Sequence, residues 1–554
     1  MKRMRCFGLL ATVGALVLCG GPRVGRAEEL ARLMAMDRQS GDDFGFSVAI
    51  SGDCALVGAP GKDTLDSDAG AAYIFRFDGA YWVQEAKLLA SDGAMGDAFG
   101  VAVAISGDYA LVGAEGAKAG DTKNAGAVYA FRFNGTHWSQ TGKLTAPIPV
   151  NNDNFGCCVA TDGSKAIIGA WGNDAQGLDA GAAYVFQRSG AAWLTQQTLV
   201  APDGEGDDSF GIAVAVDGGT LIVGASGDND HGNDSGSAYI YADSAGAWTL
   251  QQKLVAPDGV TNQHFGRSVA IRNGSIVVGA PGDQDAGYSS GAAYGYAWNG
   301  AGWASTTKMK PIDVGPGDAF GHAVALTDVS VLAGARGEHA GYTFVWDGNN
   351  WAQRSKIRDA YGGSNDLYAY SIGVDGDHAV VGAPGDDQDT GSAYIYDDMS
   401  NQTAPIYRFW SPIFQNHFYT ISQVERDYVR ATWPFAWSYE EISYYAYPRN
   451  SAAGLVPVYR FWSGQLASHF YTANPEERDF VLAHYPGVWA YEGVVFYAFP
   501  PDYQPAGTVP VYRFWSETLA AHFYTALESE KQSLMNRPEW GWGYEGIAWY
   551  AYPR

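Results

Sequence analysis

Basic residues are scarce in this sequence. Its 554 residues include 35 Lys and Arg against 60 Asp and Glu, and the formal net charge is −25. Proteins that bind nucleic acids or anionic membranes usually carry a basic surface, so this balance argues against both kinds of partner. No segment after residue 27 is apolar enough to cross a membrane, which takes roughly 20 apolar residues. We therefore expect no nucleic-acid partner and no membrane span.

Cysteine is also rare, with five residues in the chain, two of them before residue 20. The other three are Cys54, Cys157 and Cys158, an odd number that does not form a disulfide framework. Adjacent cysteines on a strand point to opposite faces, which disfavours a shared metal ion. We expect all three to be small buried apolar residues.

The amino terminus has the pattern of an export signal. Three basic residues within the first five precede an apolar stretch over residues 6–20, and small residues at 25 and 27 suit signal peptidase. We predict a signal peptide over residues 1–27, cleaved after Ala27, and a secreted, extracellular or periplasmic protein. A lipid anchor through Cys19 is the alternative.

Glycine and aromatic residues are abundant. Gly accounts for 71 residues and aromatics for 14 % of the chain. Disordered chains lack such aromatic content, and helical bundles do not tolerate so much glycine. The composition therefore indicates a mainly β, turn-rich protein with more than one domain.

One unit recurs seven times. It opens on Phe-Gly at residues 44, 99, 155, 210, 265 and 320 and on Tyr-Ala at 368, so the steps are 55, 56, 55, 55, 55 and 48. Gly-Ala follows in every unit, with glycine at residues 58, 113, 169, 224, 279, 334 and 382. Regular recurrence of this kind is typical of repeat architectures.

Each unit is predicted to form four strands. In the first unit, residues 47–50 and 55–59 form a hairpin around Gly52-Asp53, and residues 71–77 and 82–89 follow. The first two strands carry small residues and the outer two carry aromatics, which suits sheets that converge on an axis. We predict a seven-bladed β-propeller over residues 28–398.

The seventh unit lacks a fourth strand of its own. The sequence of residues 28–37 matches the fourth strand and exit loop that precede Phe99. We predict that residues 30–36 complete the seventh blade and close the ring, leaving no open edge.

These units resemble the FG-GAP repeat of the integrin α-subunit propeller, in the form found in secreted bacterial proteins. The resemblance rests on the Phe-Gly and Gly-Ala motifs and covers about residues 28–398. It implies the propeller fold and a family that often serves in adhesion and in protein or ligand binding. Fold alone does not fix function.

The Asp-x-Asp-x-Asp-Gly calcium loop of integrin blades is missing. Acidic loops that follow Gly-Ala are candidates for loose Ca²⁺ binding at one rim, and calcium is the one possible cofactor. These residues are Asp228, Asp230, Asp234, Asp283, Asp285, Asp386, Asp387 and Asp389. The alternative is that they are solvated turn carboxylates of an acidic protein.

A linker over residues 399–405 precedes a different unit, which occurs three times, at 406–449, 458–500 and 511–554. Each copy contains Tyr-Arg-Phe-Trp, His-Phe-Tyr-Thr and Trp-x-Tyr-Glu. We predict two short strands, one short helix and a closing strand pair per copy, arranged about a pseudo-threefold axis. Ser422 and Asn474 mark the first two helix starts, and Thr525 is a candidate to cap the third one turn early. The unit resembles the DUF5648 family, which carries no known mechanism.

Aromatic residues of this region are candidate ligand contacts, because aromatic faces stack on sugar rings. The tryptophan that begins each Trp-x-Tyr-Glu turn is the ring expected to face outward; the alternative is that these rings are simply the core of a small domain. The candidates are Trp437, Trp489 and Trp542, Tyr439, Tyr491 and Tyr544, and His417, His469 and His522. The histidines recur with Glu440, Glu492 and Glu545, but a catalytic pair normally occurs once per chain, so we predict no catalytic residues.

Two functions remain open at this point. The first is an exported, non-catalytic binding or adhesion protein with an extracellular protein or glycan ligand, whose carboxyl-terminal repeats bind carbohydrate or cell wall. The alternative is a secreted hydrolase with its active site in the propeller mouth. A cluster of perturbed carboxylates near the axis would favour the hydrolase.

Overall fold

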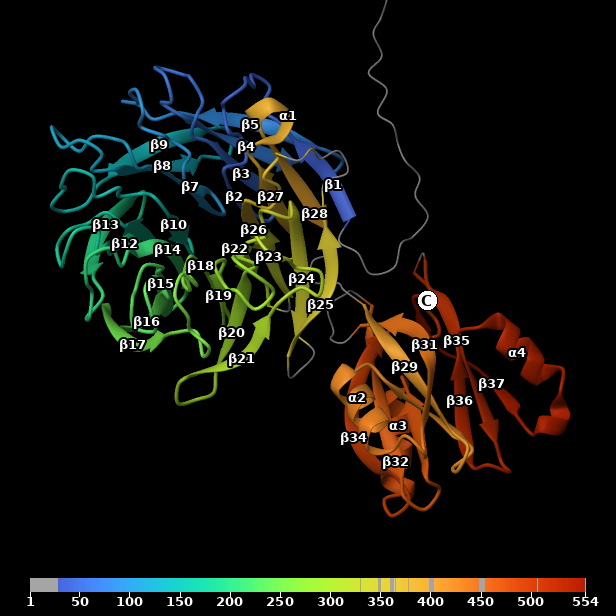
Figure 1. Ribbon diagram of the computed structural model, residues 1–554. Helices are drawn as coiled ribbons and strands as arrows, with labels where there is room; N and C mark the ends of the chain where they lie inside the picture. Colours follow the sequence, from blue (N-terminus) through green and yellow to red (C-terminus); the bar gives the residue numbers. More distant parts are fainter. Residues whose placement is uncertain are drawn as a thin grey trace, which may run out of the picture. The chain divides into compact units, whose positions relative to one another are not determined.

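The computed structural model describes residues 28–328, 330–346, 350–358, 363, 365–376, 378–397, 403–447, 454–505 and 507–553 (Figure 1). The chain forms two compact units, Arg26–Gln402 and Thr403–Arg554. The predicted signal peptide and most of the predicted linker lie outside the described residues. No helix in the described part of the chain has the length and apolar character needed to cross a membrane.

The first unit consists of seven four-stranded antiparallel sheets around an axis, as predicted (Figure 1). The first strand of each sheet lies innermost and the fourth lies at the rim. The first four sheets contain β2 (Ser47–Ser51), β3 (Cys54–Ala59), β4 (Ala71–Phe77) and β5 (Trp82–Leu88); β6 (Val103–Ser106), β7 (Tyr109–Ala114), β8 (Ala127–Phe133) and β9 (Trp138–Leu144); β10 (Val159–Thr161), β11 (Lys165–Ala170), β12 (Ala182–Ser189) and β13 (Ala192–Leu199); and β14 (Phe210–Asp217), β15 (Thr220–Ala225), β16 (Ser237–Ser244) and β17 (Ala247–Leu254).

The last three sheets follow the same order. They contain β18 (Ser268–Arg272), β19 (Ser275–Ala280), β20 (Ala292–Trp298) and β21 (Trp303–Met309); β22 (Phe320–Leu326), β23 (Ser330–Ala335), β24 (Ala340–Trp346) and β25 (Trp351–Ile357); and β26 (Ser371–Asp375), β27 (His378–Ala383), β28 (Ser392–Asp397) and β1 (Glu28–Leu33). A four-residue helical turn, α1 (Asp386–Asp389), joins β27 to β28.

The two repeated motifs meet where neighbouring sheets touch. A Cβ atom on Gly58 would lie 2.0 Å from the carbonyl oxygen of Gly100 in the next sheet, so no larger residue fits there. Phe99 is fully buried and packs edge to face on Tyr129, with ring centroids 5.5 Å apart. The Phe99 N–H donates to the carbonyl of Ala69 in the preceding sheet (3.1 Å). Each motif pair therefore fixes one junction between blades.

The seventh sheet takes its outer strand from the amino-terminal side of the unit. β1 pairs antiparallel with β28, with Leu33 opposite Ala393. Leu33 is 2 % exposed, and Arg32 Nε donates to the hydroxyl of Ser392 (2.9 Å). The strand spans Glu28–Leu33 rather than residues 30–36, because the chain leaves the sheet after Leu33 to enter the loop toward the first blade.

The second unit contains three three-stranded sheets, one per repeat. Within each repeat the elements follow the order strand, strand, helix, strand. The first repeat has β29 (Ala404–Ser411), β30 (Asn416–Thr420), α2 (Gln423–Thr432) and β31 (Ser438–Ala446); the second has β32 (Val456–Ser463), β33 (Ser468–Thr472), α3 (Pro475–His484) and β34 (Ala490–Ala498); and the third has β35 (Val509–Ser516), β36 (Ala521–Thr525), α4 (Glu528–Met535), the 3-10 turn η1 (Pro538–Trp540) and β37 (Gly543–Ala551).

The predicted closing strand pair is wrong. A single nine-residue strand closes each repeat, and it pairs along the whole first strand across two register shifts. The helix starts at Ser422 and Asn474 are confirmed, since both side chains accept N–H bonds from the first turn. The third helix begins at Glu528 with no side-chain cap, and the Thr525 hydroxyl instead accepts from Leu527 N–H (3.0 Å).

Three tyrosines join the repeats at their common axis. The Tyr471 hydroxyl donates to the carbonyl of Tyr419 (2.8 Å) and accepts from the Tyr419 N–H (3.1 Å). Tyr524 bonds in the same way to Tyr471, and Tyr419 bonds to Tyr524, so the set closes on itself. All three side chains are at most 2 % exposed. The ring of bonds sets the relative positions of the three sheets.

Closure by β1 makes a testable prediction. Deleting residues 28–36 leaves β28 as an unpaired edge, so we expect a melting temperature lower by roughly 5 °C or more, or aggregation. Within the strand, Leu33→Ala should cost about 2–4 kcal/mol of unfolding free energy because it leaves a cavity. Leu30→Ala, at a side chain 48 % exposed, is the matched control and should be nearly neutral. Equal melting of the deletion variant and the intact chain would contradict this closure.

Candidate functional site

The predicted calcium carboxylates surround lysine side chains. Lys253 Nζ lies 2.8 Å from Asp228 and 2.6 Å from Asp230. Burial opposes its charge, but its hydrogen bonds to these carboxylates raise the pKa of Lys253. Lys308 makes the equivalent contacts with Asp283 and Asp285, both at 2.8 Å. An ammonium ion therefore stands where a metal ion would need to bind.

The remaining predicted acids differ from these two clusters. Arg32 donates to Asp386 and to Asp387 (3.0 Å), so this pair also has a protein cation. Asp234 accepts from the neighbouring Asn233 amide and does not join the Lys253 cluster. Asp389 offers its backbone carbonyl to Gly41 N–H (2.9 Å), which ties α1 to the first blade. These contacts support structural roles for the acidic loops.

The lysines belong to a latch between blades that sequence inspection missed. An aspartate in the exit loop of one blade binds the strand-four lysine and the strand-three tyrosine hydroxyl of the next. Asp92 contacts Lys143 (2.8 Å) and the Tyr129 hydroxyl (2.7 Å). At the following junction the aspartate position holds Ile148 and the lysine position holds Thr198. The aspartate and the lysine are thus missing from the same junction. An alignment of the repeats shows that the two residues occur together, which is the signal for this contact.

In the second unit, an arginine joins two glutamates at each junction between repeats. Arg460 donates to Glu425 on the helix of the preceding repeat (3.0 and 3.1 Å) and to Glu492 of its own repeat (2.7 Å). The corresponding pairs are Arg513 with Glu477 and Glu545, both at 2.9 Å, and Arg408 with Glu530 at 2.9 Å and Glu440 at 2.8 Å. Each repeat is thus linked to both neighbours by charge-assisted bonds.

A histidine lies beside each of these arginine clusters. His469 packs between Trp462 of its own repeat (ring centroids 4.6 Å) and Phe418 of the preceding one (4.9 Å). Its Nε2 lies 3.6 Å from Glu492. His417 and His522 occupy equivalent positions, 3.4 and 3.3 Å from Glu440 and Glu545.

The His417 and His469 imidazoles are poorly prepared for proton transfer at neutral pH. Burial, followed by the charge of Arg460, lowers the pKa of His469 to about 3, and burial also lowers that of His417. Burial works to raise the pKa of Glu440, but the contacts of His417 and Arg408 outweigh it and hold that pKa low. A neutral imidazole beside an ionised carboxylate offers no acid with a pKa near 7. The histidine rings serve as packing contacts between repeats, each on a phenylalanine of the neighbouring one.

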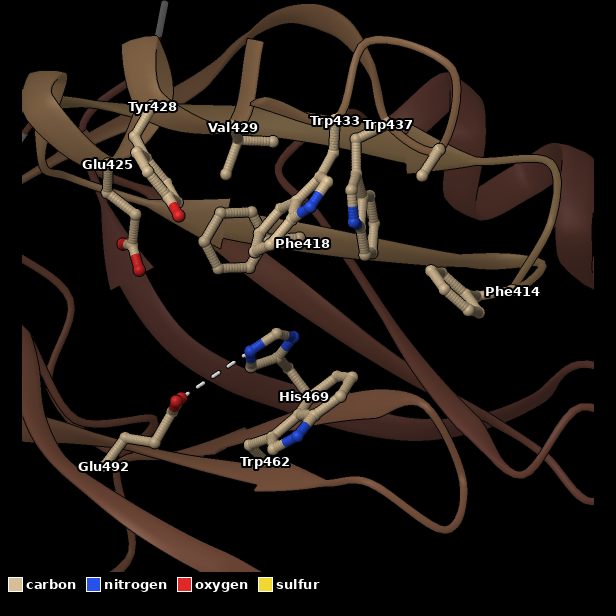
Figure 2. A pocket seen from close by; sticks show the side chains of 11 residues that line it. Phe414, Phe418, Glu425, Tyr428, Val429, Trp433, Trp437, Trp462, His469 and Glu492 are labelled. Carbon is tan, nitrogen blue, oxygen red and sulfur yellow. Dashed lines mark ion pairs between the residues drawn. The ribbon is translucent and has the colours of Figure 1, made fainter. Parts of the chain in front are cut away.

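The junction between the first and second repeats opens into a cleft of about 500 Å³. One wall comes from the first repeat and includes Trp433, Trp437 and Phe414; the facing wall carries Trp462 and His469 from the second repeat (Figure 2). The cleft is completed by Phe418, Glu425, Tyr428, Val429, Ala436 and Glu492. The volume lies within the range of small-molecule sites.

The rings of the cleft differ in how far they reach solvent. Tyr428 is 55 % exposed and Trp433 is 49 % exposed, and their rings pack edge to face at 5.5 Å. Trp437 is 9 % exposed and packs on Phe418 (5.9 Å), so the expectation that it faces outward is wrong. Phe414 is 38 % exposed. The exposed rings leave flat apolar faces at the mouth of the cleft.

The predicted ligand contacts are only partly gathered here. Trp437 and His469 line the cleft, and Glu492 lies at its floor. Trp489 and Trp542 are half-buried against Phe470 (5.9 Å) and Phe523 (6.0 Å). The other candidates lie outside this cleft: Tyr439, Tyr491, Tyr544, His417 and His522.

Sequence inspection missed Trp462, Tyr428, Trp433 and Phe414. Trp462 could have been found, since it belongs to the Tyr-Arg-Phe-Trp motif and pairs across the sheet with His469. The other three mark where the first repeat departs from the third, which has Ser533, Pro538 and Leu519 at the corresponding places. The second repeat keeps aromatic residues at two of these places, Phe480 and Tyr485. The contrast between the first and third repeats is the signal for this cleft.

Comparisons with known proteins identify both kinds of repeat. Residues 28–75, 82–131, 138–186, 193–241 and 248–296 match the FG-GAP repeat, and residues 370–499 and 437–552 match the domain of unknown function DUF5648. Each FG-GAP match begins in the outer strand of one sheet and ends in the third strand of the next. None of the curated proteins compared with the chain matches it. A solved structure titled "Crystal Structure of Mitotic Checkpoint Complex" is similar at 12 % identity and a TM-score of 0.43, covering 72 % of this chain and 98 % of that chain.

The lysine-filled clusters predict a weak calcium response. We expect millimolar Ca²⁺ to leave the melting temperature of the chain unchanged. Lys308→Met should cost about 2 kcal/mol, because it leaves the buried Asp283 carboxylate without its cation, and Ca²⁺ should restore part of the loss. Lys310→Met is the control, since Lys310 reaches only Asp285, at 3.6 Å. A calcium shift as large in the unaltered chain as in Lys308→Met would mean that the lysine does not fill the site.

The low pKa of His469 predicts loss of stability in acid. The unfolded state binds the proton near pH 6.5 and the folded state only near pH 3, so stability falls as the pH drops below about 6.5. Between pH 7 and pH 5 this group alone should remove about 2 kcal/mol. His469→Gln keeps a donor for Glu492 but does not titrate, so its thermal unfolding should vary less with pH. An unchanged pH profile in this variant would refute the assignment.

Proposed function

We propose that this chain, which combines an FG-GAP repeat propeller with DUF5648 repeats, is an exported, non-catalytic binding protein that holds an extracellular carbohydrate or cell-wall polymer in the cleft between its first two carboxyl-terminal repeats. The observation that carries the proposal is the pair of facing aromatic walls, with Trp433 on one side and Trp462 on the other. Both propeller and repeat module then act as recognition units, since FG-GAP propellers typically bind proteins.

The chemistry of the cleft suits a sugar ring. Aromatic faces pack on the apolar faces of pyranose rings, and tyrosine and tryptophan add a polar edge for hydroxyl groups. The carboxylates of Glu425 and Glu492 reach the cleft while bonded to Arg460, and their oxygens can also accept from hydroxyls. A neutral polyol is favoured over a free anion, because these carboxylates would repel a negative ligand.

Catalysis has less support than binding. A hydrolase in the propeller mouth would need an acid and a base that face one substrate. Burial, followed by Asp389 and Asp42, raises the pKa of Asp43 to about 6, and burial raises that of Glu115. Burial also raises the pKa of Asp208 to about 6. Yet Glu115 has Trp171 as its hydrogen-bonding partner, Asp43 interacts with Asp389 and Asp42, and Asp208 interacts with Asp228. These three carboxyls do not pair with one another.

Binding to insoluble polysaccharides and to a glycan array tests the proposal. Trp433→Ala and Tyr428→Ala remove exposed rings and should each weaken retention roughly tenfold while leaving the melting temperature nearly unchanged. Trp540→Ala is the matched control, because Trp540 is equally exposed (48 %) but belongs to the third repeat and lies outside the cleft. Substituting Trp437, Trp489 and Trp542 together is a poorer test, since all three pack on phenylalanines. Retention that is equal in all variants, or absent in the unaltered chain, would refute the proposal.

A further inference from the structure

Two positions of the repeat place side chains at one end of the propeller axis. The residue after Phe-Gly lies at the start of each first strand, and the residue after Gly-Ala follows each second strand. Because these strands are antiparallel and the first strands touch around the ring, both positions face the same opening. In blade order the first position holds Phe46, Val101, Cys157, Ile212, Arg267, His322 and Tyr370, and the second holds Pro60, Glu115, Trp171, Ser226, Pro281, Arg336 and Pro384.

Arg267 directly precedes β18, the innermost strand of the fifth sheet, and β18 packs against β22, the innermost strand of the sixth sheet, which carries His322. The charge of Arg267 interacts with Tyr370 of the seventh sheet, with Arg336 of the sixth, and with Cys157 and Cys158 of the third. A side chain of the fifth sheet can reach all of these groups only near the centre of the ring. Burial lowers the pKa of Arg267, and none of the neighbouring groups that shift this pKa further is a carboxylate.

Arg336 brings a second positive charge to the same place. Its Nη1 donates to His322 Nε2 (3.3 Å), and the His322 ring packs on Tyr370 at 5.0 Å. Burial, followed by Arg267 and Arg336, lowers the pKa of His322 to about 3, so the imidazole is neutral. Among the described residues, neither arginine forms an ion pair with a carboxylate, whereas Arg32, Arg76 and Arg272 of the same unit do.

Two unpaired arginines at one opening are unusual in a chain of net charge −25. Like charges brought together cost free energy unless a counter-charge is present, and the cost is higher where one of them, here Arg267, is half-buried. Within the described ranges, Arg132 and Arg188 of the same unit also lack a carboxylate partner, but both lie over the Tyr109 ring, and Arg188 donates to the Gly163 carbonyl. Arg267 and Arg336 differ from them because the two positive charges lie at one opening. We propose that this end of the propeller channel binds an oxyanion, the carboxylate or phosphate group of a ligand, between Arg267 and Arg336.

The surroundings suit such a group. Guanidinium ions bind carboxylates and phosphates through paired N–H donors. The Tyr370 hydroxyl offers a further donor, and its ring packs on Phe46 at 4.9 Å to form an apolar side. Arg336 is exposed, so the opening is reached from solvent. Asp43 and Glu115 also act on Tyr370, so both carboxyls lie near this opening. Glu115 has Trp171 as its hydrogen-bonding partner, and among the described residues neither carboxyl forms an ion pair with Arg267 or Arg336.

Calorimetric titration of the full chain in low-salt buffer tests the site. Inorganic phosphate and succinate are the two probes, and they separate a phosphate site from a carboxylate site. We expect saturable heat with at least one probe and a rise in melting temperature in its presence. Arg267→Gln and Arg336→Gln should each weaken binding about tenfold or more, since each removes a charge-assisted contact.

Arg272→Gln is the matched control, because Arg272 ends the same strand that Arg267 precedes and lies at its opposite end, paired with Asp328. It should bind as the unaltered chain does. In the absence of probe, Arg267→Gln should melt no lower than the unaltered chain, because it removes repulsion from Arg336. Should Arg267→Gln fold poorly, the exposed Arg336→Gln decides the question. No heat with either probe, or equal weakening by Arg272→Gln, would overturn the proposal, and neither result bears on the aromatic cleft.

Discussion

Hydrogen bonds from three tyrosine hydroxyls hold the carboxyl-terminal unit together. Each hydroxyl bonds to the backbone of an edge strand, where a further strand would otherwise pair. β30, β33 and β36 are edge strands of small sheets, and their outward backbone groups would otherwise be buried without partners. The hydroxyl of Tyr419, Tyr471 or Tyr524 satisfies one N–H and one C=O of the adjacent repeat. Because the three bonds form a cycle, each repeat depends on the other two. The junctions, and the cleft in one of them, follow from that arrangement.

The near-symmetry of the three repeats distinguishes the residues that hold the unit together from those that line the cleft. Arginine, glutamate, histidine and tryptophan recur at all three junctions, and their contacts have nearly the same distances each time. The cleft wall recurs only in part: Tyr428 and Trp433 have the aromatic counterparts Phe480 and Tyr485 in the second repeat but Ser533 and Pro538 in the third. Residues that keep the symmetry hold the unit together, and residues that break it shape a surface for a ligand.

Much of the fold could be predicted from the sequence, because each repeated motif has a local cause. Gly58 is required by the backbone of the next blade, and Ser422 and Asn474 cap helices through their own first turns. The candidate site was harder to predict. Whether Trp437 is buried depends on a partner ring, Phe418, at another point of the chain, and whether Asp283 is free depends on Lys308. Such contacts between distant residues leave no trace in local spacing.

The way the ring closes also governs the order in which the propeller forms. Six of the seven sheets are built from consecutive strands, so each can pair soon after its own residues are available. The seventh joins residues as far apart as Arg32 and Ser392, which are separated by 360 positions. Closing so long a loop carries the largest entropic cost of any sheet in this unit. The last blade is therefore expected to form late, since the ring is complete only after the other six sheets have brought its two ends together.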